Sequence, residues 1–197
     1  MDLALSSLQK RLREFKRHGY DLPASRRFIW KLSGIRRGKV LEIGTGKGHL
    51  TALLSQKGLD IISVDLDGEV LKSAKAHLSA LKLNKRVSLR KMNAEKLRFN
   101  SRSFDNVISM DFFHHAKDPL RCLREIMRVT RKTLVIADLN RNGMRIMDLV
   151  HKSEGKKHET PKIPFTDLKK HLLAHHFNVK NYRHPCHQIF VAQRRKS

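Results

Sequence analysis

The sequence predicts an α/β fold built on a mostly parallel sheet with helices on both faces. Beyond about residue 38, short runs rich in β-branched residues alternate with helical patterns, and a glycine-rich turn separates the first run from the first helix. This alternation is typical of βαβ units. The chain has 197 residues, of which 40% are hydrophobic, so it is long enough to fold as one compact domain with its own core.

Five strands are expected before residue 138, and two more are expected as a C-terminal hairpin joined through Pro185. The expected strands cover residues 39–43, 61–65, 87–90, 104–110, 133–137, 178–183 and 188–193. The expected helices cover residues 49–56, 69–81, 119–129 and 166–177. Val70, Ala74 and Leu78 form an apolar stripe at helical spacing, and Pro119 suits the first turn of a helix, where no backbone N–H is needed.

The first 38 residues are expected to form a helical segment that covers the active site. Apolar residues recur at helical spacing between Leu5 and Phe15, and residues 25–32 predict a second short helix that ends before Gly34. Open α/β sheets bind ligands at the carboxyl ends of their strands. We therefore expect these helices to pack over that edge of the main domain, which comprises residues 39–197.

The chain is strongly basic, with 42 Lys and Arg residues against 18 Asp and Glu residues and a net charge of +24. Such a field attracts polyanions, so nucleic acids, anionic membranes and acidic substrates all remain open as partners. No apolar run approaches the roughly 18 residues of a membrane span, and basic residues stand where a signal peptide needs its apolar region. We expect a cytoplasmic protein in which Cys122 and Cys186 are reduced and structural.

The glycine-rich turn reads Gly44-Thr45-Gly46-Lys47-Gly48 and lets the backbone approach a ligand closely. A phosphate-binding P-loop needs Ser or Thr after Gly-Lys, but Gly48 follows Lys47. A dinucleotide site needs G-x-G-x-x-G, and Glu42, two residues before Gly44, suits an ammonium group better than a pyrophosphate. Asp65 ends the second strand, where a carboxylate can bind both ribose hydroxyls. These residues predict a ligand with an amino acid end and a ribose.

These motifs resemble those of the class I S-adenosylmethionine-dependent methyltransferases, and the chain from Val40 to Asp138 is similar to their type 11 subgroup. The resemblance implies a Rossmann-like seven-stranded sheet with a C-terminal antiparallel hairpin, and S-adenosylmethionine as cofactor. In this family, the segment after the third strand lines the adenine pocket, which implies this role for Asn93 and Ala94. The family usually has a Gly-Gly turn before its fifth strand, whereas this chain has Thr130-Arg131-Lys132-Thr133. The expected cofactor-binding residues are Glu42, Gly44, Thr45, Gly46, Gly48, Asp65, Leu66, Asn93, Ala94 and Met110.

The candidate catalytic residues follow the fourth strand, at the edge of the sheet where the ligand is expected. Asp111, His114 and His115 are candidates for a general base. The family often carries a histidine at the position of His115, which also fits a structural role. The polar stretch at residues 140–164 is interpreted as a solvated loop or a substrate-facing lid that carries His151, Glu154 and His158. Although the chain has 12 histidines, no convincing set of three ligands is evident, so no metal is expected.

The preferred methyl acceptor is a small molecule, and RNA is the main alternative. The glycine loop also resembles that of the ribosomal RNA adenine dimethylases, and the charge of +24 fits RNA. Those enzymes carry Asn/Asp-Pro-Pro-Tyr/Phe where this chain has Met110-Asp111-Phe112-Phe113, which argues against adenine N6 methylation. Aromatic residues make up only 6% of the chain, so stacking platforms for bases are scarce. A second alternative is a non-catalytic module that keeps the cofactor pocket and binds a nucleic acid or another partner.

Overall fold

The computed structural model describes residues 2–153 and 162–195 and contains a seven-stranded sheet in the order β3-β2-β1-β4-β5-β7-β6. Strands β1 to β5 are parallel, β7 is antiparallel to β5, and β6 forms a hairpin with β7. The strands are β1 (Val40–Ile43), β2 (Ile61–Asp65), β3 (Val87–Lys91), β4 (Phe104–Met110), β5 (Thr130–Leu139), β6 (Phe177–His184) and β7 (His187–Arg194). The predicted fold class is confirmed.

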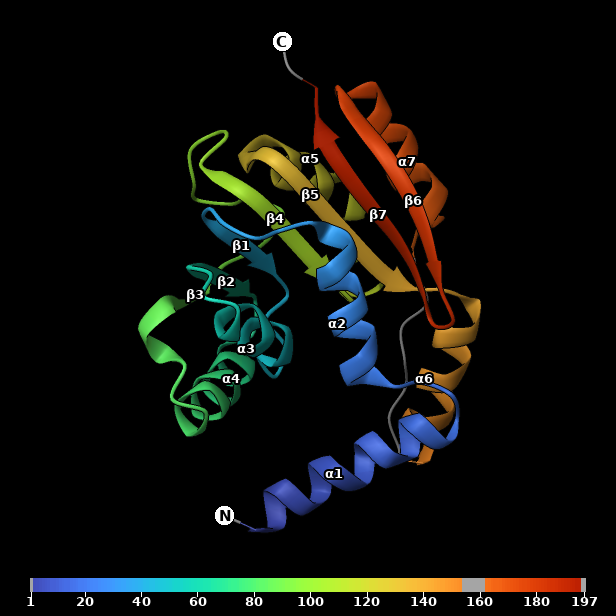
Figure 1. The fold of residues 1–197 in the computed structure, drawn as a ribbon. Helices are drawn as coiled ribbons and strands as arrows, with labels where there is room; N and C mark the ends of the chain where they lie inside the picture. The colour runs from blue at the N-terminus through green and yellow to red at the C-terminus, as the bar shows by residue number, and fades with distance from the viewer. Residues whose placement is uncertain (1, 154–161, 196–197) are drawn as a thin grey trace.

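Helices cover both faces of the sheet, as the alternation of strand side chains requires. The helices are α1 (Asp2–Arg17), α2 (Leu22–Ser33), α3 (His49–Gln56), α4 (Gly68–Ala80), α5 (Pro119–Val129), α6 (Arg141–Ser153) and α7 (Phe165–Ala174). Val40 packs with α2 and α3, whereas the next residue, Leu41, packs on the other face with α5 and α7. Figure 1 shows α2 in front of the strands and α5 behind them.

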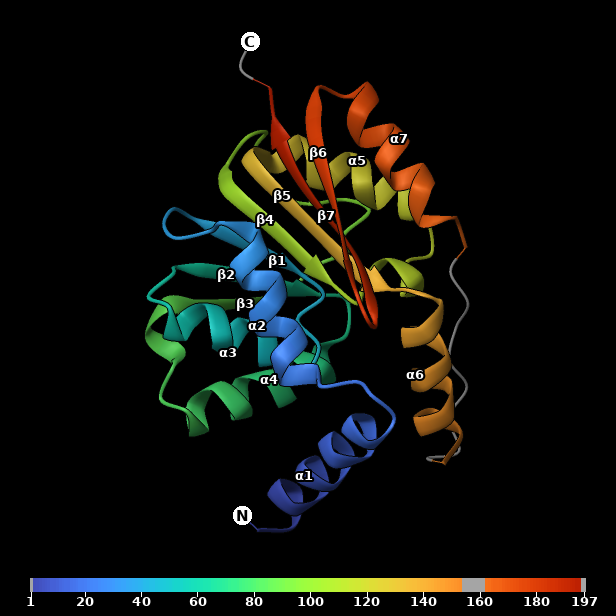
Figure 2. The ribbon, with the colours of Figure 1, turned by 45° about the vertical axis from the view of Figure 1, so that its right-hand side comes forward.

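The N-terminal helices lie where the sheet's carboxyl edge and one face meet. Asp21 starts α2 because its Oδ1 accepts the backbone N–H of Ala24 at 2.9 Å, and Gly34 ends the helix in the left-handed conformation. Figure 2 shows α1 and α6 beyond the carboxyl ends of β4 and β5. Phe15 and Tyr20 pack there with Ile146 of α6 in a small third core cluster. The N-terminal segment therefore packs against α6 and the end of β5.

The polar stretch after β5 differs from its predicted form, because residues 141–153 form helix α6 rather than a loop. The side-chain oxygen of Asn140 accepts the N–H of Gly143 at 2.9 Å, and Ile146 and Val150 are buried one helical turn apart. These two signals were present in the sequence. His151 lies on α6 and contacts Arg11 of α1. The lid residues proposed at positions 154 and 158 lie outside the described residues.

Three other boundaries differ by three residues from the predicted ones, and one of them is the end of α7, at Ala174 and not Phe177, because Phe177 begins β6. Strand β5 begins at Thr130, directly after α5, so the Thr130-Arg131-Lys132-Thr133 segment replaces the family's glycine turn with extended backbone. Helix α2 begins three residues earlier than predicted, at Leu22, because of the Asp21 cap. Among the described helices, none is both long and apolar enough to cross a membrane.

Candidate functional site

The candidate site is a cavity of about 880 Å³ at the carboxyl ends of β1, β2 and β4. The strand order reverses between β1 and β4, and ligands of open α/β sheets bind outside the carboxyl ends at such a switch point. The cavity brings together all of the predicted cofactor and catalytic residues except Gly48 and His114. The predicted residues that line it are Glu42, Gly44, Thr45, Gly46, Asp65, Leu66, Asn93, Ala94, Met110, Asp111 and His115.

The glycine loop forms one wall of this cavity, and the space around its three glycines differs. All three adopt positive φ angles of 82°, 51° and 75° at Gly44, Gly46 and Gly48. A Cβ on Gly44 would lie 3.2 Å from the Phe112 ring, and one on Gly48 would lie 3.2 Å from Ala74. A Cβ on Gly46 would meet no protein atom within 4 Å, because Gly46 faces open space. This cradle is where a bound ligand can approach the backbone.

Glu42 is a buried acid at the end of β1, only 1% exposed. Thr51 Oγ1 donates to Glu42 Oε2 at 2.5 Å. Burial raises the pKa of Glu42 to about 7, against the opposing effects of hydrogen bonds from Ser63 and Thr51 and of the Arg26 charge. A carboxyl group held in this way becomes a strong acceptor for a cationic ligand group, whose charge favours the ionised form.

Arg26 is a cavity residue that sequence reasoning missed. It lies on α2 and faces Glu42 and Asp111 closely enough to interact with both electrostatically. Within the described chain its guanidinium forms no hydrogen bond and no ion pair, and burial lowers the pKa of Arg26. Burying part of an unpaired cation costs free energy unless an anionic group of a ligand pairs with it. No local motif marks Arg26, because only the docking of α2 brings it to the cavity.

Asp65 closes the glycine loop from the neighbouring strand. Its Oδ2 accepts the N–H of Gly46 at 3.0 Å, and its Oδ1 accepts the N–H of Asp67 at 3.1 Å. Asp67, and not Asp65, caps α4 by accepting the N–H groups of Glu69 and Val70. Asp65 therefore both shapes the loop and lines the cavity, which agrees with its predicted position.

The predicted adenine side of the cavity carries Asn93 and Ala94 after β3. Asn93 Oδ1 accepts the N–H of Glu95 at 2.8 Å, which holds the turn, and Ala94 is buried. His49, at the start of α3, faces the cavity as well. Burial lowers the pKa of His49 to about 4, with smaller contributions from the charges of Arg26, His77 and Lys47. His49 is therefore neutral at physiological pH.

Asp111 stands at the end of β4 in the left-handed conformation, with φ of 54°. Its Oδ2 accepts the hydroxyl proton of Tyr20 at 3.3 Å, and its Oδ1 lies 3.0 Å from His187 Nε2. Burial acts to raise the pKa of Asp111, but the charge and hydrogen bond of His187, with His114 and Arg26, bring it below its usual value. An ordered, ionised carboxylate with strained backbone is a feature that clusters at functional sites.

His114 and His115 lie on a single turn after β4 but have different surroundings. His115 lines the cavity, whereas His114 is 3% exposed and does not line it. The Nδ1 of His114 is hydrogen-bonded to Asp138 at the end of β5, and Asp138 Oδ2 also accepts the backbone N–H of His114 at 3.0 Å. This pair ties the turn to β5. In the described part of the chain, no three His, Cys, Asp or Glu side chains are grouped to hold a metal ion.

The part of the chain that carries most of the lining of this cavity is similar in sequence to a known family of proteins. Residues 41–136 match a family model described as a methyltransferase domain, of type 11. Phosphatidylethanolamine N-methyltransferase from Cereibacter sphaeroides is 33% identical over 97 residues, 49% of this chain and 47% of that protein. A ubiquinone biosynthesis O-methyltransferase from Nitrosomonas europaea is 29% identical over 114 residues, 56% of this chain and 48% of that protein. The chain thus spans about half the length of these curated relatives.

The fold of the chain is also similar to that of solved methyltransferase structures. A SAM-dependent methyltransferase from Aquifex aeolicus superposes with a TM-score of 0.68 at 21% identity, covering 85% of this chain and 88% of that one. The matched residues 41–136 run from β1 through β5 and include the glycine loop, Asp65, Asn93 and Asp111. The resemblance inferred from the sequence is confirmed: residues 41–136 are a methyltransferase domain of the type 11 group, on a class I S-adenosylmethionine-dependent methyltransferase fold.

Proposed function

We propose that this chain binds S-adenosylmethionine in the 880 Å³ cavity and transfers its methyl group to a small-molecule acceptor. The observation that carries the cofactor assignment is the pairing of opposite charges at one end of the cavity. The Glu42 carboxyl group suits the ammonium of the cofactor's amino acid end, and the unpaired Arg26 guanidinium suits its carboxylate. Asp65 suits the ribose hydroxyls, and Gly46 leaves room for the ligand beside the loop.

The charge of the cavity supports the same ligand. S-adenosylmethionine carries a sulfonium, an ammonium and a carboxylate, and so has a net positive charge. Although the chain has a net charge of +24, the cavity lining has more acids than Lys and Arg residues. The acids are Glu42, Asp65, Asp67, Glu95 and Asp111, and the cations are Arg26, Lys47 and Lys117. This lining favours a cationic cofactor and disfavours a polyanion in the same space.

When bound, S-adenosylmethionine supplies an electrophilic methyl group on sulfur, so the transfer is an in-line displacement. The chain's residues align the acceptor and exclude water. Asp111 and His115 face the cavity beyond the glycine loop and are the candidates to accept a proton from a hydroxyl or ammonium acceptor. His114 holds the turn that carries His115, through its hydrogen bond to Asp138.

A small acceptor is favoured by the size of the cavity and by the relatives. About 880 Å³ lies within the roughly 300–1,000 Å³ of sites for small ligands and cofactors. Both curated relatives named above are methyltransferases whose names specify a lipid or a quinone-pathway compound. RNA methylation and cofactor binding without turnover are the competing functions.

One labelling experiment tests the three functions together. The full chain is first titrated with S-adenosylhomocysteine by thermal shift, where binding to the folded state alone raises Tm. It is then incubated with methyl-labelled S-adenosylmethionine and with separated small-molecule and RNA fractions of a cell extract. We expect label in the small-molecule fraction. Label in RNA would establish the RNA alternative, and a thermal shift with no label in either fraction would establish a binding module.

A further inference from the structure

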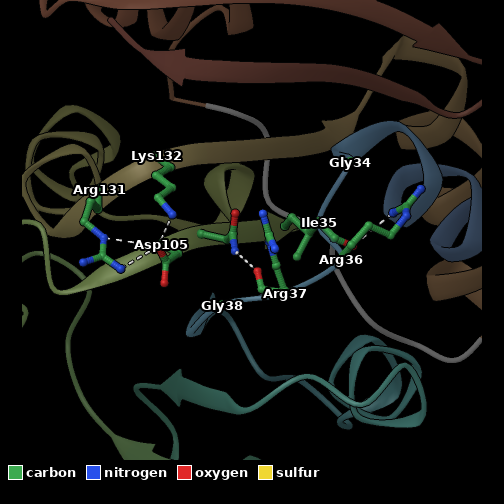
Figure 3. Close-up of a pocket in the computed structure, with 9 residues that line it drawn as sticks. Gly34, Ile35, Arg36, Arg37, Gly38, Asp105, Arg131 and Lys132 are labelled. Atoms are coloured by element: carbon green, nitrogen blue, oxygen red, sulfur yellow. Dashed lines mark hydrogen bonds and ion pairs between the residues drawn. The ribbon is translucent and has the colours of Figure 1, made fainter. Parts of the chain in front are cut away.

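A second cavity, of about 430 Å³, opens at the opposite edge of the sheet, where β1, β4 and β5 begin. It is lined by the loop from Gly34 to Gly38, by Asp105 and Asn106 of β4, and by Arg131 and Lys132 of β5. Figure 3 shows Arg131 and Lys132 reaching Asp105 on one side, with Arg36 and Arg37 on the loop at the other. The proposed methyl transfer uses none of these residues.

The cations of this cavity are held in place by the fold. Asp105 Oδ1 lies 2.6 Å from the Arg131 guanidinium and 2.9 Å from Lys132 Nζ. Asn106 Nδ2 donates to the backbone oxygen of Arg37 at 3.0 Å, which fixes the loop against β4. Gly38 has φ of 93°, and a Cβ there would lie 2.8 Å from Asp105, so the loop approaches the strand as closely as glycine allows. The single charge of the buried Asp105 carboxylate thus positions both Arg131 and Lys132 and cannot neutralise both.

Basic residues continue from this cavity along the amino-terminal edge of the sheet. The Trp30 ring has the Arg36 guanidinium 4.8 Å and the Lys57 ammonium 4.9 Å from its centroid, which positions both cations. Two acids lie on this edge, Asp60 just before β2 and Asp105 at the start of β4. Both already form ion pairs with basic residues. Lys and Arg residues on this edge include Arg36, Arg37, Lys39, Lys57, Lys85, Arg86, Arg102, Arg131 and Lys132. We call these nine residues the basic edge.

We propose that the basic edge docks the phosphodiester backbone of a nucleic acid, with the 430 Å³ cavity seating one phosphate group. Preorganised Arg and Lys side chains are the usual phosphate ligands, and a row of them matches a polyanion better than a single small anion. The large exposed apolar side chains, such as Phe28 and Leu66, do not line this cavity, so it lacks the apolar anchors of a lipid-binding surface. Trp30 is covered by cations and provides no stacking platform, so binding is largely independent of sequence.

The docking site is distinct from the site of methyl transfer. On β4 the nearest lining residues of the two cavities are Asn106 and Met110, which lie about 13 Å apart because a strand rises about 3.3 Å per residue. The acid-rich cofactor cavity repels the same backbone that the basic edge attracts. Nucleic acid affinity should therefore be unchanged by S-adenosylhomocysteine, and this proposal does not depend on the proposed methyl acceptor.

Fluorescence anisotropy with labelled single-stranded RNA and DNA of equal length, titrated with KCl, tests the proposal on the full chain. We compare Arg36→Ala/Arg37→Ala with Arg124→Ala/Lys180→Ala, which removes the same charge from exposed positions on α5 and β6. We expect the first variant to lose roughly tenfold or more in affinity and to reduce the salt slope by about 1.4, at about 0.7 per phosphate for single strands. The control variant should change little. RNA and DNA affinities then show which nucleic acid is preferred.

Equal losses in the two variants would overturn the proposal, because bulk charge alone would then explain binding. So would binding to anionic phospholipid vesicles that is lost in Arg36→Ala/Arg37→Ala while RNA binding is not. Because Arg36 packs on Trp30, its removal can destabilise the fold. Arg37→Glu is a second test, since the Arg37 side chain is exposed, and Arg124→Glu is its control. A loss of RNA affinity in Arg37→Glu that Arg124→Glu does not share supports the basic edge.

Discussion

His187 Nε2 lies 3.0 Å from Asp111 Oδ1, although the two residues are 76 positions apart in the chain. The contact joins the end of β4 to the start of β7, and Tyr20 completes it by donating to Asp111 Oδ2 and lying 3.0 Å from the same His187 nitrogen. Three distant segments therefore meet at one carboxylate on the cavity wall. This cluster holds the N-terminal segment against the sheet where the acceptor is expected.

The cluster predicts strong energetic coupling between Tyr20 and Asp111. Tyr20→Phe keeps the ring packing and should lower the free energy of unfolding by about 1 kcal/mol, the value of one hydrogen bond. Asp111→Ala leaves two buried partners without an acceptor and should cost roughly 2–3 kcal/mol. In a double-mutant cycle measured by urea unfolding, the coupling should exceed about 0.5 kcal/mol. Additive effects of the two substitutions would show that the hydrogen bond between Tyr20 and Asp111 contributes nothing to stability.

The glycine loop predicts that a single methyl group at Gly46 blocks the cofactor. Gly46→Ala should lose S-adenosylhomocysteine binding in calorimetry, because the Cβ points into ligand space, and should cost about 1–2 kcal/mol of stability from its positive φ. Gly58→Ala is the matched control, because Gly58 also has a positive φ and open space around its Cβ, but lies away from the cavity. Loss of binding in both variants would indicate a general loss of structure.

Asp65 is predicted to contribute to cofactor affinity through its charge. Asp65→Ala should weaken S-adenosylhomocysteine binding by roughly 1–3 kcal/mol, through lost charge-assisted hydrogen bonds to the ribose. Asp60→Ala, directly before the start of the same strand, removes an equal charge and should leave the affinity unchanged. Unchanged calorimetric affinity in Asp65→Ala would assign the ribose to another side chain.

Arg26 is predicted to recognise the carboxylate of the cofactor. Arg26→Ala should lose roughly 10- to 100-fold in affinity for S-adenosylhomocysteine, because a hydrogen-bonded charge pair contributes about 1.5–3 kcal/mol. It should bind 5′-methylthioadenosine, which lacks the amino acid end, as well as the parent chain does. Arg27→Ala, an exposed neighbour on α2, is the control. An equal loss for both ligands would mean that Arg26 supports the cavity without contacting the carboxylate.

Glu42 predicts a specific pH dependence. Its folded pKa of about 7 exceeds the ordinary 4.5, so the folded state favours the protonated acid. The resulting stability is fully present below pH 4.5 and is lost as the pH rises through 7, with an upper limit of about 3 kcal/mol. Glu42→Gln should therefore be more stable than the parent at pH 8 and similar to it near pH 4.5 in thermal unfolding.

The affinity for the cofactor should depend on pH in the opposite sense, because the cofactor favours the ionised form of Glu42. The affinity of the parent chain for S-adenosylmethionine should rise between pH 6 and pH 8 as the carboxyl group ionises, and that of Glu42→Gln should be weaker and flatter over this range. A parent affinity that does not vary with pH would show that Glu42 is already ionised in the free protein.

The fold could be predicted largely from local patterns. The strands from β1 to β5 and helix α3 lie at or close to the expected residues, because β-branched runs and helical periodicity are local signals. Helix α6 was missed because its charged and polar residues hid a short apolar stripe at Ile146 and Val150, which is buried in a cluster formed with distant segments, namely α1, the start of α2, the end of β5 and the β6–β7 turn. The predicted role of the first 38 residues in covering the site stays a prediction.

The sequence by itself determined the glycine loop, the acids Glu42 and Asp65, and the turn after β3, because each lies at or just after the carboxyl end of a strand, and these ends face the same edge of a parallel sheet. Only the tertiary structure brought Arg26, Tyr20 and His187 to that edge, and only it placed His114 beside Asp138, outside the lining of the cavity. The physical reason is that a motif fixes its own backbone locally, whereas contacts between distant segments depend on how α2 and the C-terminal hairpin pack on the sheet.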